Sequence, residues 1–275
     1  MGVVAVGAVH AVAIRYTQQM LLCSVHGCHL GLVRDGRRMI CPRKHSFDIA
    51  RSGYINLLQP QERRAKQPGD TAEAIAARRR LHDRGFTKDQ RLAIAEAINA
   101  NSDDAVLDAG CGDGFYLGTL QREIGFQAHG IDISIPAVDA AARRYKECEW
   151  IVANADRMVP YADQSFAIVM SITARMNPGE FRRVLREGGR LLVAIPAPDD
   201  LIELRGSGRD RVGQTVDRFA GHFTLMNQRR VSTCADFDAS DVRDALISIY
   251  RPMGAHPVEG RRVTLSLDLL LFQVT

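Results

Sequence analysis

The stretch Val106-Leu-Asp-Ala-Gly-Cys-Gly-Asp-Gly-Phe-Tyr116 decides the fold of this chain. Apolar residues typical of a strand lead into a turn with the pattern Asp108-x-Gly110-x-Gly112-x-Gly114, and a helix is predicted to follow. Glycines here let the backbone approach a ligand closely and adopt dihedral angles that a β-carbon forbids. In a parallel α/β sheet, such a turn places the ligand at the carboxyl end of the strand.

The ligand of this turn is not expected to be a dinucleotide. A dinucleotide site has the spacing G-x-G-x-x-G, which brings a pyrophosphate to a helix N-terminus. Here the third glycine comes one residue early, and Asp113 adds a negative charge that would repel pyrophosphate. A zwitterionic or cationic ligand fits the turn better. A nucleotide-type fold that has lost its ligand stays open as an alternative.

Strand and helix patterns alternate from Asp104 onward. The predicted strands are Ala105–Asp108, Gln127–Ile131, Glu149–Ala153, Phe166–Ile172 and Arg190–Ile195, with helical stretches such as Ile135–Arg144 and Gly179–Arg186 between them. This alternation predicts a doubly wound, mostly parallel α/β sheet. Runs at Arg230–Ala235 and Val263–Val274 predict an antiparallel edge pair, so we expect seven strands within a domain over residues 101–275.

A second motif precedes this domain. Cys23 and Cys28 are followed by Cys41 and His45, with the spacing Cys-x4-Cys, twelve residues, then Cys-Pro-x-x-His. Thiolates and imidazole are the ligands that zinc prefers in closed tetrahedral sites. His26 lies within the first pair and is an alternative ligand. We expect residues 21–58 to form a zinc-binding module that recognises RNA, because so short a segment buries little core and needs a metal to fold.

Charge is unevenly distributed along the 275 residues. From Arg34 to Arg91 there are 15 Lys or Arg residues and 7 Asp or Glu residues, whereas the whole chain carries a net charge of only +4. A basic block beside a catalytic domain indicates nucleic-acid binding, although a solvated helix face has the same composition. Of the six cysteines, three belong to the predicted zinc cluster and Cys111, Cys148 and Cys234 are scattered, which gives no disulfide framework and favours a reducing cytoplasm. Residues 1–20 are expected to be a disordered tail or a mis-assigned start, and the apolar run Val3–Ile14 is too short for a membrane span.

Residues 59–100 are expected to contain a basic linker and two helices. Asp70 and Glu73 form a predicted capping box for a helix over Thr71–Arg84. Thr87 and Gln90 repeat this pattern for a helix that runs to about residue 100. The arginines of the first helix, Arg78 to Arg80, either hold RNA phosphates or form an ordinary exposed face.

Three further segments agree with the glycine turn. Gly130-Ile-Asp-Ile-Ser134, Asn154-Ala-Asp156 and Phe181-Arg-Arg-Val-Leu-Arg-Glu-Gly-Gly189 resemble, in order and spacing, motifs of the class I S-adenosylmethionine-dependent methyltransferases. The resemblance implies that S-adenosylmethionine is the cofactor. The cofactor-binding residues that it implies are Asp108, Gly110, Gly112, Asp113, Gly114, Asp132, Ile133, Asn154 and Ala155.

The N-terminal part narrows the resemblance. Cys41-Pro-Arg-Lys-His-Ser-Phe-Asp48, Gly53-Tyr-Ile-Asn-Leu-Leu58, Pro68-Gly-Asp70 and Arg78-Arg79 resemble the 23S ribosomal RNA guanine-N1 methyltransferases of the RlmA/TlrB type. This resemblance runs from about Leu22 to Pro198. It implies zinc at the four donors, cofactor contacts at Thr87 and Asp200, a guanine in a hairpin or loop of 23S rRNA as substrate, and two subunits embracing one RNA.

The chain departs from this family around the acceptor pocket. Ser171-Ile-Thr-Ala-Arg-Met176 stands where the family usually has Ala-Pro-Cys, and Asp199 and Asp200 stand where a basic or imidazole residue is expected. A methyltransferase for a small molecule or another RNA, and an RNA-binding protein with a decayed site, therefore stay open. Guanine N1 carries a proton, so a base is needed. Asp200 and Asp70 are the candidates, and Asp70 could equally be a helix cap. Phe115, Tyr116 and Tyr161 could stack on a base or belong to the core.

Overall fold

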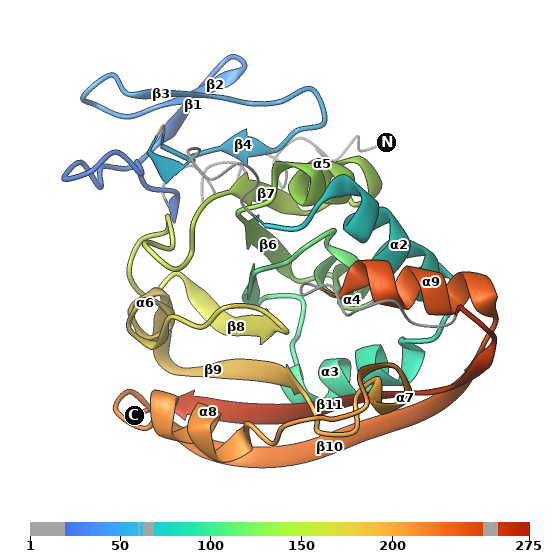
Figure 1. The fold of residues 1–275 in the computed structure, drawn as a ribbon. Helices are drawn as coiled ribbons and strands as arrows, with labels where there is room; N and C mark the ends of the chain where they lie inside the picture. The colour runs from blue at the N-terminus through green and yellow to red at the C-terminus, as the bar shows by residue number, and fades with distance from the viewer. Residues whose placement is uncertain (1–19, 60, 63–68, 250–257) are drawn as a thin grey trace, which may run out of the picture.

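One mixed sheet of eight strands runs through the computed structural model of the chain (Figure 1). The structure describes residues 20–59, 61–62, 69–249 and 258–275. The strand order is β10-β11-β9-β8-β5-β6-β7-β4, and five of the seven pairings are parallel. The strands are β4 (Ile55–Asn56), β5 (Ala105–Ala109), β6 (Gln127–Asp132), β7 (Glu149–Val152), β8 (Phe166–Ile172), β9 (Leu185–Pro196), β10 (Phe223–Phe237) and β11 (Arg261–Val274).

Helices cover both faces of this sheet, as the doubly wound prediction requires. Side chains of a strand point alternately to the two faces, so Val106 packs with the helices of one face and Leu107 with those of the other. The first face carries α3 (Lys88–Ile98), α4 (Phe115–Ile124) and α5 (Ile135–Arg144). The second carries α6 (Pro178–Val184) and α8 (Val212–Phe219).

The N-terminal module forms its own small antiparallel sheet. Its strands are β1 (Val33–Asp35), β2 (Arg38–Ile40) and β3 (Ser46–Asp48), in that order. The module then adds β4 to the large sheet, where Ile55 and Asn56 pair in parallel with Ile151 and Val152 of β7. The prediction of seven strands is therefore short by one. A strand of two residues is too short to show an alternating pattern in the sequence.

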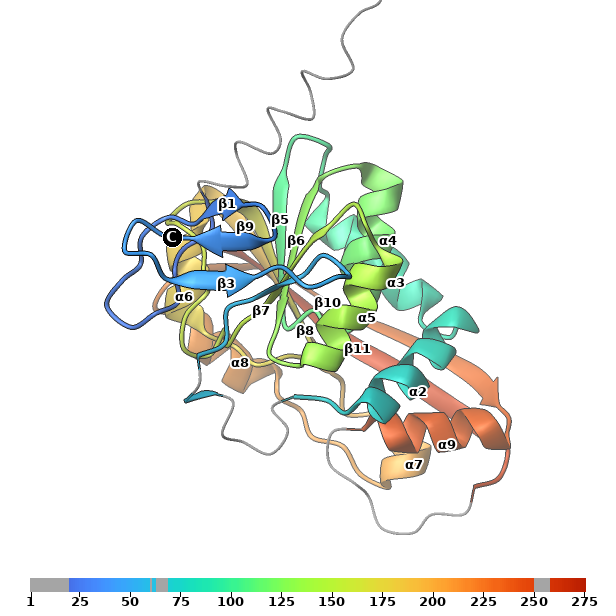
Figure 2. The same cartoon turned by 90° about the horizontal axis from the view of Figure 1, so that it is seen from above.

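The antiparallel edge pair is confirmed and is longer than predicted. β10 and β11 pair along almost their whole length, and β11 also pairs with β9. Between them, α9 (Ala239–Ser248) follows β10 and packs beside α2 (Ala72–Asp83), as both ribbon views show (Figures 1 and 2). A short helix, α7 (Ile202–Arg205), lies after β9.

The predicted helix caps are wrong in detail. Thr71, and not Asp70, is the N-cap of α2, because its hydroxyl accepts a hydrogen bond from Ala74 N at 3.1 Å. Thr87 is at the N-cap position of α3 but makes no capping hydrogen bond. Both threonine and aspartate are good N-caps, so neighbouring candidates are hard to separate by sequence.

No helix among the described residues is long and apolar enough to cross a membrane. The apolar run Val3–Ile14 and the expected tail lie outside the described residues.

Candidate metal centre and cofactor site

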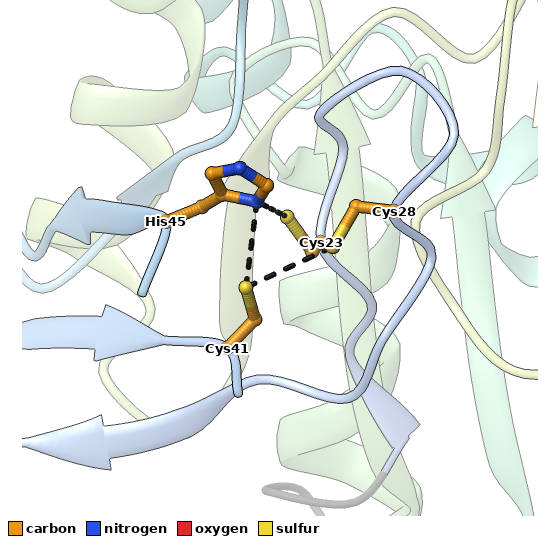
Figure 3. Close-up of side chains that lie close together, drawn as sticks. All are labelled: Cys23, Cys28, Cys41 and His45. Carbon is orange, nitrogen blue, oxygen red and sulfur yellow. Dashed lines mark hydrogen bonds between the residues drawn. The ribbon is translucent and has the colours of Figure 1, made fainter. Parts of the chain in front are cut away.

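Two tight turns bring the four predicted zinc ligands together (Figure 3). In the first turn, Cys28 N donates to Val25 O at 2.9 Å, and Gly27 has a φ of 70°. In the second, Lys44 N donates to Cys41 O at 2.8 Å between β2 and β3. The first turn precedes β1 and the second joins β2 to β3, so two separate segments of the module supply two ligands each.

The donor geometry fits a tetrahedral zinc ion. The Cys23 Sγ–His45 Nδ1 and Cys41 Sγ–His45 Nδ1 distances are 3.4 and 3.5 Å, and the Cys28 Sγ–Cys41 Sγ distance is 3.8 Å. Ideal zinc bond lengths put sulfur and nitrogen about 3.6 Å apart and two sulfurs about 3.8 Å apart. The x4 spacing of the first pair is accommodated by its turn. His26 is exposed and lies outside the cluster, so it does not compete as a ligand.

The three glycines of the turn after β5 have two different surroundings. A β-carbon on Gly110 would come within 2.3 Å of Ala174 Cβ, and one on Gly114 within 2.4 Å of the Trp150 ring. A β-carbon on Gly112 would meet nothing closer than Arg78 Nη1, at 3.8 Å. All three glycines have positive φ. Gly110 and Gly114 therefore allow tight packing, whereas Gly112 borders open space at the carboxyl end of β5.

Two buried carboxylates lie beside this turn. Asp132 accepts hydrogen bonds from Gly112 N at 2.9 Å and Ser134 N at 2.8 Å, which ties together the loops after β5 and β6. Burial raises its pKa. Burial, with the nearby Asp132 charge, raises the pKa of Asp108 to about 8. Asp108 Oδ1 is buried and has no hydrogen-bond partner among the described residues. An unpaired buried carboxylate oxygen and an open glycine suit a cationic or zwitterionic ligand.

The other predicted cofactor residues border the same end of the sheet. Ile133 follows Asp132 and packs against Gly69. A β-carbon added to Gly69 would lie 3.1 Å from Ile133 Cγ2. Asn154 and Ala155 lie in the loop that follows β7, and Ala155 O accepts from Asn177 Nδ2 at 3.0 Å.

Asp113 and Thr87 are committed to protein partners. Arg79 Nε donates to Asp113 Oδ2 at 2.9 Å. The Thr87 hydroxyl lies 2.7 Å from His82 Nδ1, and the His82 ring stacks on Phe115 with 3.9 Å between centroids. His82 thus connects Thr87 to Phe115, the residue that follows the glycine turn. Sequence reasoning missed this histidine, because no local pattern marks a ring that packs across two helices.

The two candidate bases differ in their surroundings. Asp200 is buried after β9, accepts from Ser266 N at 3.0 Å and lies 3.5 Å from Arg205 Nη1. Burial raises the pKa of Asp200. Asp70 instead accepts a hydrogen bond from Arg78 Nη1 at 2.7 Å.

The three consecutive arginines do not form a free basic face. Arg78 pairs with Asp70, Arg79 with Asp113, and Arg80 with Asp244 of α9. Each therefore has a carboxylate partner within the protein, and their binding to RNA phosphates stays a prediction. The pairs instead join α2 to the cofactor turn and to α9.

The aromatic candidates for base stacking all contact other side chains, and Tyr161 is buried whereas Phe115 and Tyr116 are half-buried. Tyr161 is fully buried against Phe166 and His129. Phe115 stacks on His82, and the Tyr116 hydroxyl donates to Gln90 Oε1 at 3.1 Å. These contacts give all three rings a packing role.

The module and the cofactor domain share a small cavity. Its volume is about 170 Å³, and its lining includes Ser24, His26 and His29 from the module and Asn154 from the loop after β7. Leu57 N also donates to Val152 O at 2.9 Å. The module is thus joined to the sheet at the carboxyl end of β7, the end at which the predicted cofactor residues lie.

Comparison with known proteins agrees with both halves of the chain. Residues 22–66 match the family model described as RlmA, N-terminal, and residues 106–194 match that of a methyltransferase domain. The chain is 36% identical over 223 residues to the 23S rRNA (guanine(748)-N(1))-methyltransferase of Streptomyces fradiae, covering 77% of this chain and 78% of that protein. The chain belongs to the family of 23S rRNA (guanine-N1)-methyltransferases.

Other similarities agree with this family assignment. A putative 23S rRNA (guanine-N(1)-)-methyltransferase of Micromonospora griseorubida is 36% identical over 203 residues, covering 67% of this chain and 68% of that protein. Among solved structures, a TehB-like SAM-dependent methyltransferase from Corynebacterium glutamicum has a TM-score of 0.50 at 18% identity, covering 74% of this chain and 98% of that one. The fold is therefore that of class I methyltransferases, with a zinc ribbon at the N-terminus.

Proposed function

We propose that this protein transfers a methyl group from S-adenosylmethionine to N1 of a guanine in 23S ribosomal RNA. The observation that carries the proposal is the junction of the two parts of the chain. The zinc module supplies β4 to the sheet and borders Asn154, at the carboxyl end of β7 where the predicted cofactor residues lie. An RNA held by the module would therefore lie beside the site of methyl transfer. The similarity to relatives that are named 23S rRNA guanine-N1 methyltransferases supports the same reaction.

The chain's own groups would position the reactants. S-adenosylmethionine, when bound, supplies an electrophilic methyl group on a sulfonium. Gly112 leaves room for it, while Asp108 and Asp132 offer carboxylates to its cationic group and its ribose. An in-line displacement needs the nucleophile aligned with this methyl group, which is mainly a positioning task.

Asp200 is the better candidate for accepting the guanine N1 proton. Its raised pKa makes it a stronger base than an exposed aspartate, and Ser266 N holds its carboxylate in place. Asp70 is less available, because its carboxylate is paired with Arg78. Residues 171–176 differ from the Ala-Pro-Cys that the family usually has. Ala174 of this segment lies against Gly110, so the segment would shape the acceptor pocket.

The exposed face of the zinc module would hold the RNA backbone. Its exposed cations are Arg34, Arg37, Arg38, Arg43, Lys44 and Arg51. Such contacts position an RNA and make its affinity salt-dependent. Guanine N1 is paired inside a stem, so the target would be a loop nucleotide or an extruded base of a hairpin. We further propose action as a homodimer in the cytoplasm, where the ribosomal substrate is.

The test is methyl transfer to RNA. Purified protein would be incubated with tritiated S-adenosylmethionine and 23S rRNA from a strain that lacks this protein. Incorporation would be mapped by primer extension, because a methyl group on guanine N1 blocks base pairing and stops the polymerase. We expect one strong stop. Tight cofactor binding without incorporation into rRNA would contradict the proposal and favour a small molecule or another RNA as substrate.

Matched variants separate the parts of the reaction. Asp200→Asn should lose transfer and show a much smaller loss of cofactor affinity, since the resemblance also implies a cofactor contact at Asp200. Cys41→Ala should lose zinc and RNA binding, whereas Cys234→Ala, at an exposed cysteine outside the zinc cluster, should behave as the parent protein.

A further inference from the structure

Arg78 lies between the two loops that flank the cofactor site. Its Nη1 is the atom nearest to the open side of Gly112, 3.8 Å from an ideal β-carbon there. The same nitrogen donates to Asp70 Oδ2 at 2.7 Å, and Asp70 O accepts from the Ser134 hydroxyl at 2.9 Å. Arg78 is therefore held over the gap between the loop after β5 and the loop after β6.

The guanidinium is fixed there but not saturated. Arg78 Nη2 donates to Ser248 O, at the end of α9, at 3.0 Å. Two of its five N–H donors bond to described residues, and three have no acceptor in the described part of the chain. Its side chain is 32% exposed, so the free donors can be reached by a ligand. Anchoring by α9 keeps the group in place without using up its hydrogen-bonding capacity.

The cofactor site has an unbalanced charge for a zwitterion. Asp113 is paired with Arg79, and burial keeps Asp108 protonated, but Asp132 accepts only backbone N–H groups, those of Gly112 and Ser134, among the described residues. Its carboxylate suits an ammonium or a sulfonium but repels another carboxylate. The amino acid end of S-adenosylmethionine carries both charges, so its carboxylate needs a cation nearby.

Two other arginines near the site are less suitable. Arg79 donates to both the side chain and the backbone oxygen of Asp113. Arg205 lies on α7 and faces Asp200, the candidate base. Arg78 is the cation that borders Gly112 directly.

We propose that Arg78 binds the carboxylate of the methionine moiety of S-adenosylmethionine, with α9 and Asp70 holding the guanidinium in position over Gly112. This inference rests on the cofactor and not on the RNA target. Its test therefore contains no RNA, and its failure would leave the proposed RNA substrate untouched.

The experiment compares two ligands that differ only in this carboxylate. Calorimetry would measure the affinities of S-adenosylmethionine and of decarboxylated S-adenosylmethionine, which keeps the sulfonium and the amine. A charge-assisted hydrogen bond is worth a factor of about 10 to 100 in affinity, so the parent protein should prefer the intact cofactor by this factor. Arg78→Met should reduce the preference to less than about threefold, mainly by weakening the intact cofactor.

Controls separate binding from folding. Arg80→Met removes an ion pair with α9 two residues along the same helix and should keep the full preference. Arg205→Met should also keep it. Three results would overturn the proposal. Arg78→Met could lose affinity for both ligands equally, or it could keep its preference for the intact cofactor. Arg205→Met could lose that preference. If Arg78→Met does not fold, Arg78→Lys decides: its single ammonium cannot reproduce the guanidinium fork, so an undiminished preference would overturn the proposal.

Discussion

The zinc module and the catalytic sheet are stabilised in opposite ways. The strands of the module, β1 to β4, have two or three residues each, and all three residues of β1 are exposed. In the sheet, every residue of β8 is buried. Burial of apolar surface can hold the sheet together, but a segment as small as the module needs its metal. The difference teaches that one chain can combine a metal-dependent part with a self-sufficient core.

The two regions nevertheless share one side of the core. Leu21 and Leu57 of the module are buried in the same cluster as Ile151 and Tyr161 of the sheet domain. β4 adds backbone hydrogen bonds to β7. The module therefore has an inner face that belongs to the large domain and an outer face that is polar and basic. Variants that weaken one region can therefore show whether the two regions unfold independently.

The largest effect is expected from Cys41→Ala. Three remaining donors bind zinc much more weakly than four, so zinc content should fall from about one ion per chain to nearly none. Amide hydrogen exchange should show loss of protection in β2 and β3. Protection in β8 should remain, because its burial does not depend on the metal.

Cys234→Ala serves as the matched control, because Cys234 is exposed and lies outside the zinc cluster. It should keep its zinc and its exchange pattern. Equal loss of protection in β2 and β8 of Cys41→Ala would show that the two regions form one cooperative unit. It would contradict a sheet that is stable without the metal.

The second effect is expected from Leu107→Ala in the centre of the sheet. Leu107 is fully buried, and its truncation leaves a cavity that should cost about 2 to 5 kcal/mol in the free energy of unfolding. Urea denaturation can be followed through the fluorescence of Trp150, the single tryptophan, which is buried in the sheet domain. Zinc content should stay unchanged. A loss of zinc from this variant would mean that the module depends on the sheet core.

The sequence predicted the sheet better than its connection to the module. The glycine turn and the alternating strands predicted the doubly wound sheet, because long buried strands have a clear apolar pattern. The four zinc donors were recognisable by residue type and spacing. β4 was missed, since its two residues acquire their partner only through tertiary packing. The ion pairs of the α2 arginines were not foreseen for the same reason, because Asp113 and Asp244 lie far away in sequence.

The third effect concerns the pH dependence of the free energy of unfolding, which we expect to arise from Asp108 in the sheet domain. The pKa of Asp108 is raised to about 8 in the folded protein by burial, whereas a free aspartate has a value of about 4. The folded protein therefore binds the Asp108 proton more tightly than the unfolded chain does. The stability that comes from this proton is complete below pH 4 and is lost as the pH rises towards 8. Asp108→Asn stays neutral. Its stability relative to the parent should therefore rise between pH 5 and 8, by at most about 1.4 kcal/mol per pH unit.

This prediction is checked by urea denaturation of the cofactor-free proteins across that range. Leu107→Ala should follow the pH dependence of the parent, since it changes no charge. A constant difference between Asp108→Asn and the parent at every pH would contradict the assigned protonation of Asp108.

The smallest effect on stability is expected at the outer face of the module. Arg38 and Asp35 form an ion pair at 2.7 Å, but their side chains are 53% and 57% exposed. Solvent screens such a pair, so Arg38→Gln should change the free energy of unfolding by less than about 0.5 kcal/mol. If this face binds RNA, the same substitution should weaken RNA binding and lower the slope of log affinity against log salt by up to about 0.9. Arg186→Gln, which removes a cation from outside the module, should leave the RNA affinity and its salt slope unchanged. A large loss of stability in Arg38→Gln, with RNA affinity unaltered, would reverse the assignment and make the outer face a structural element of the module.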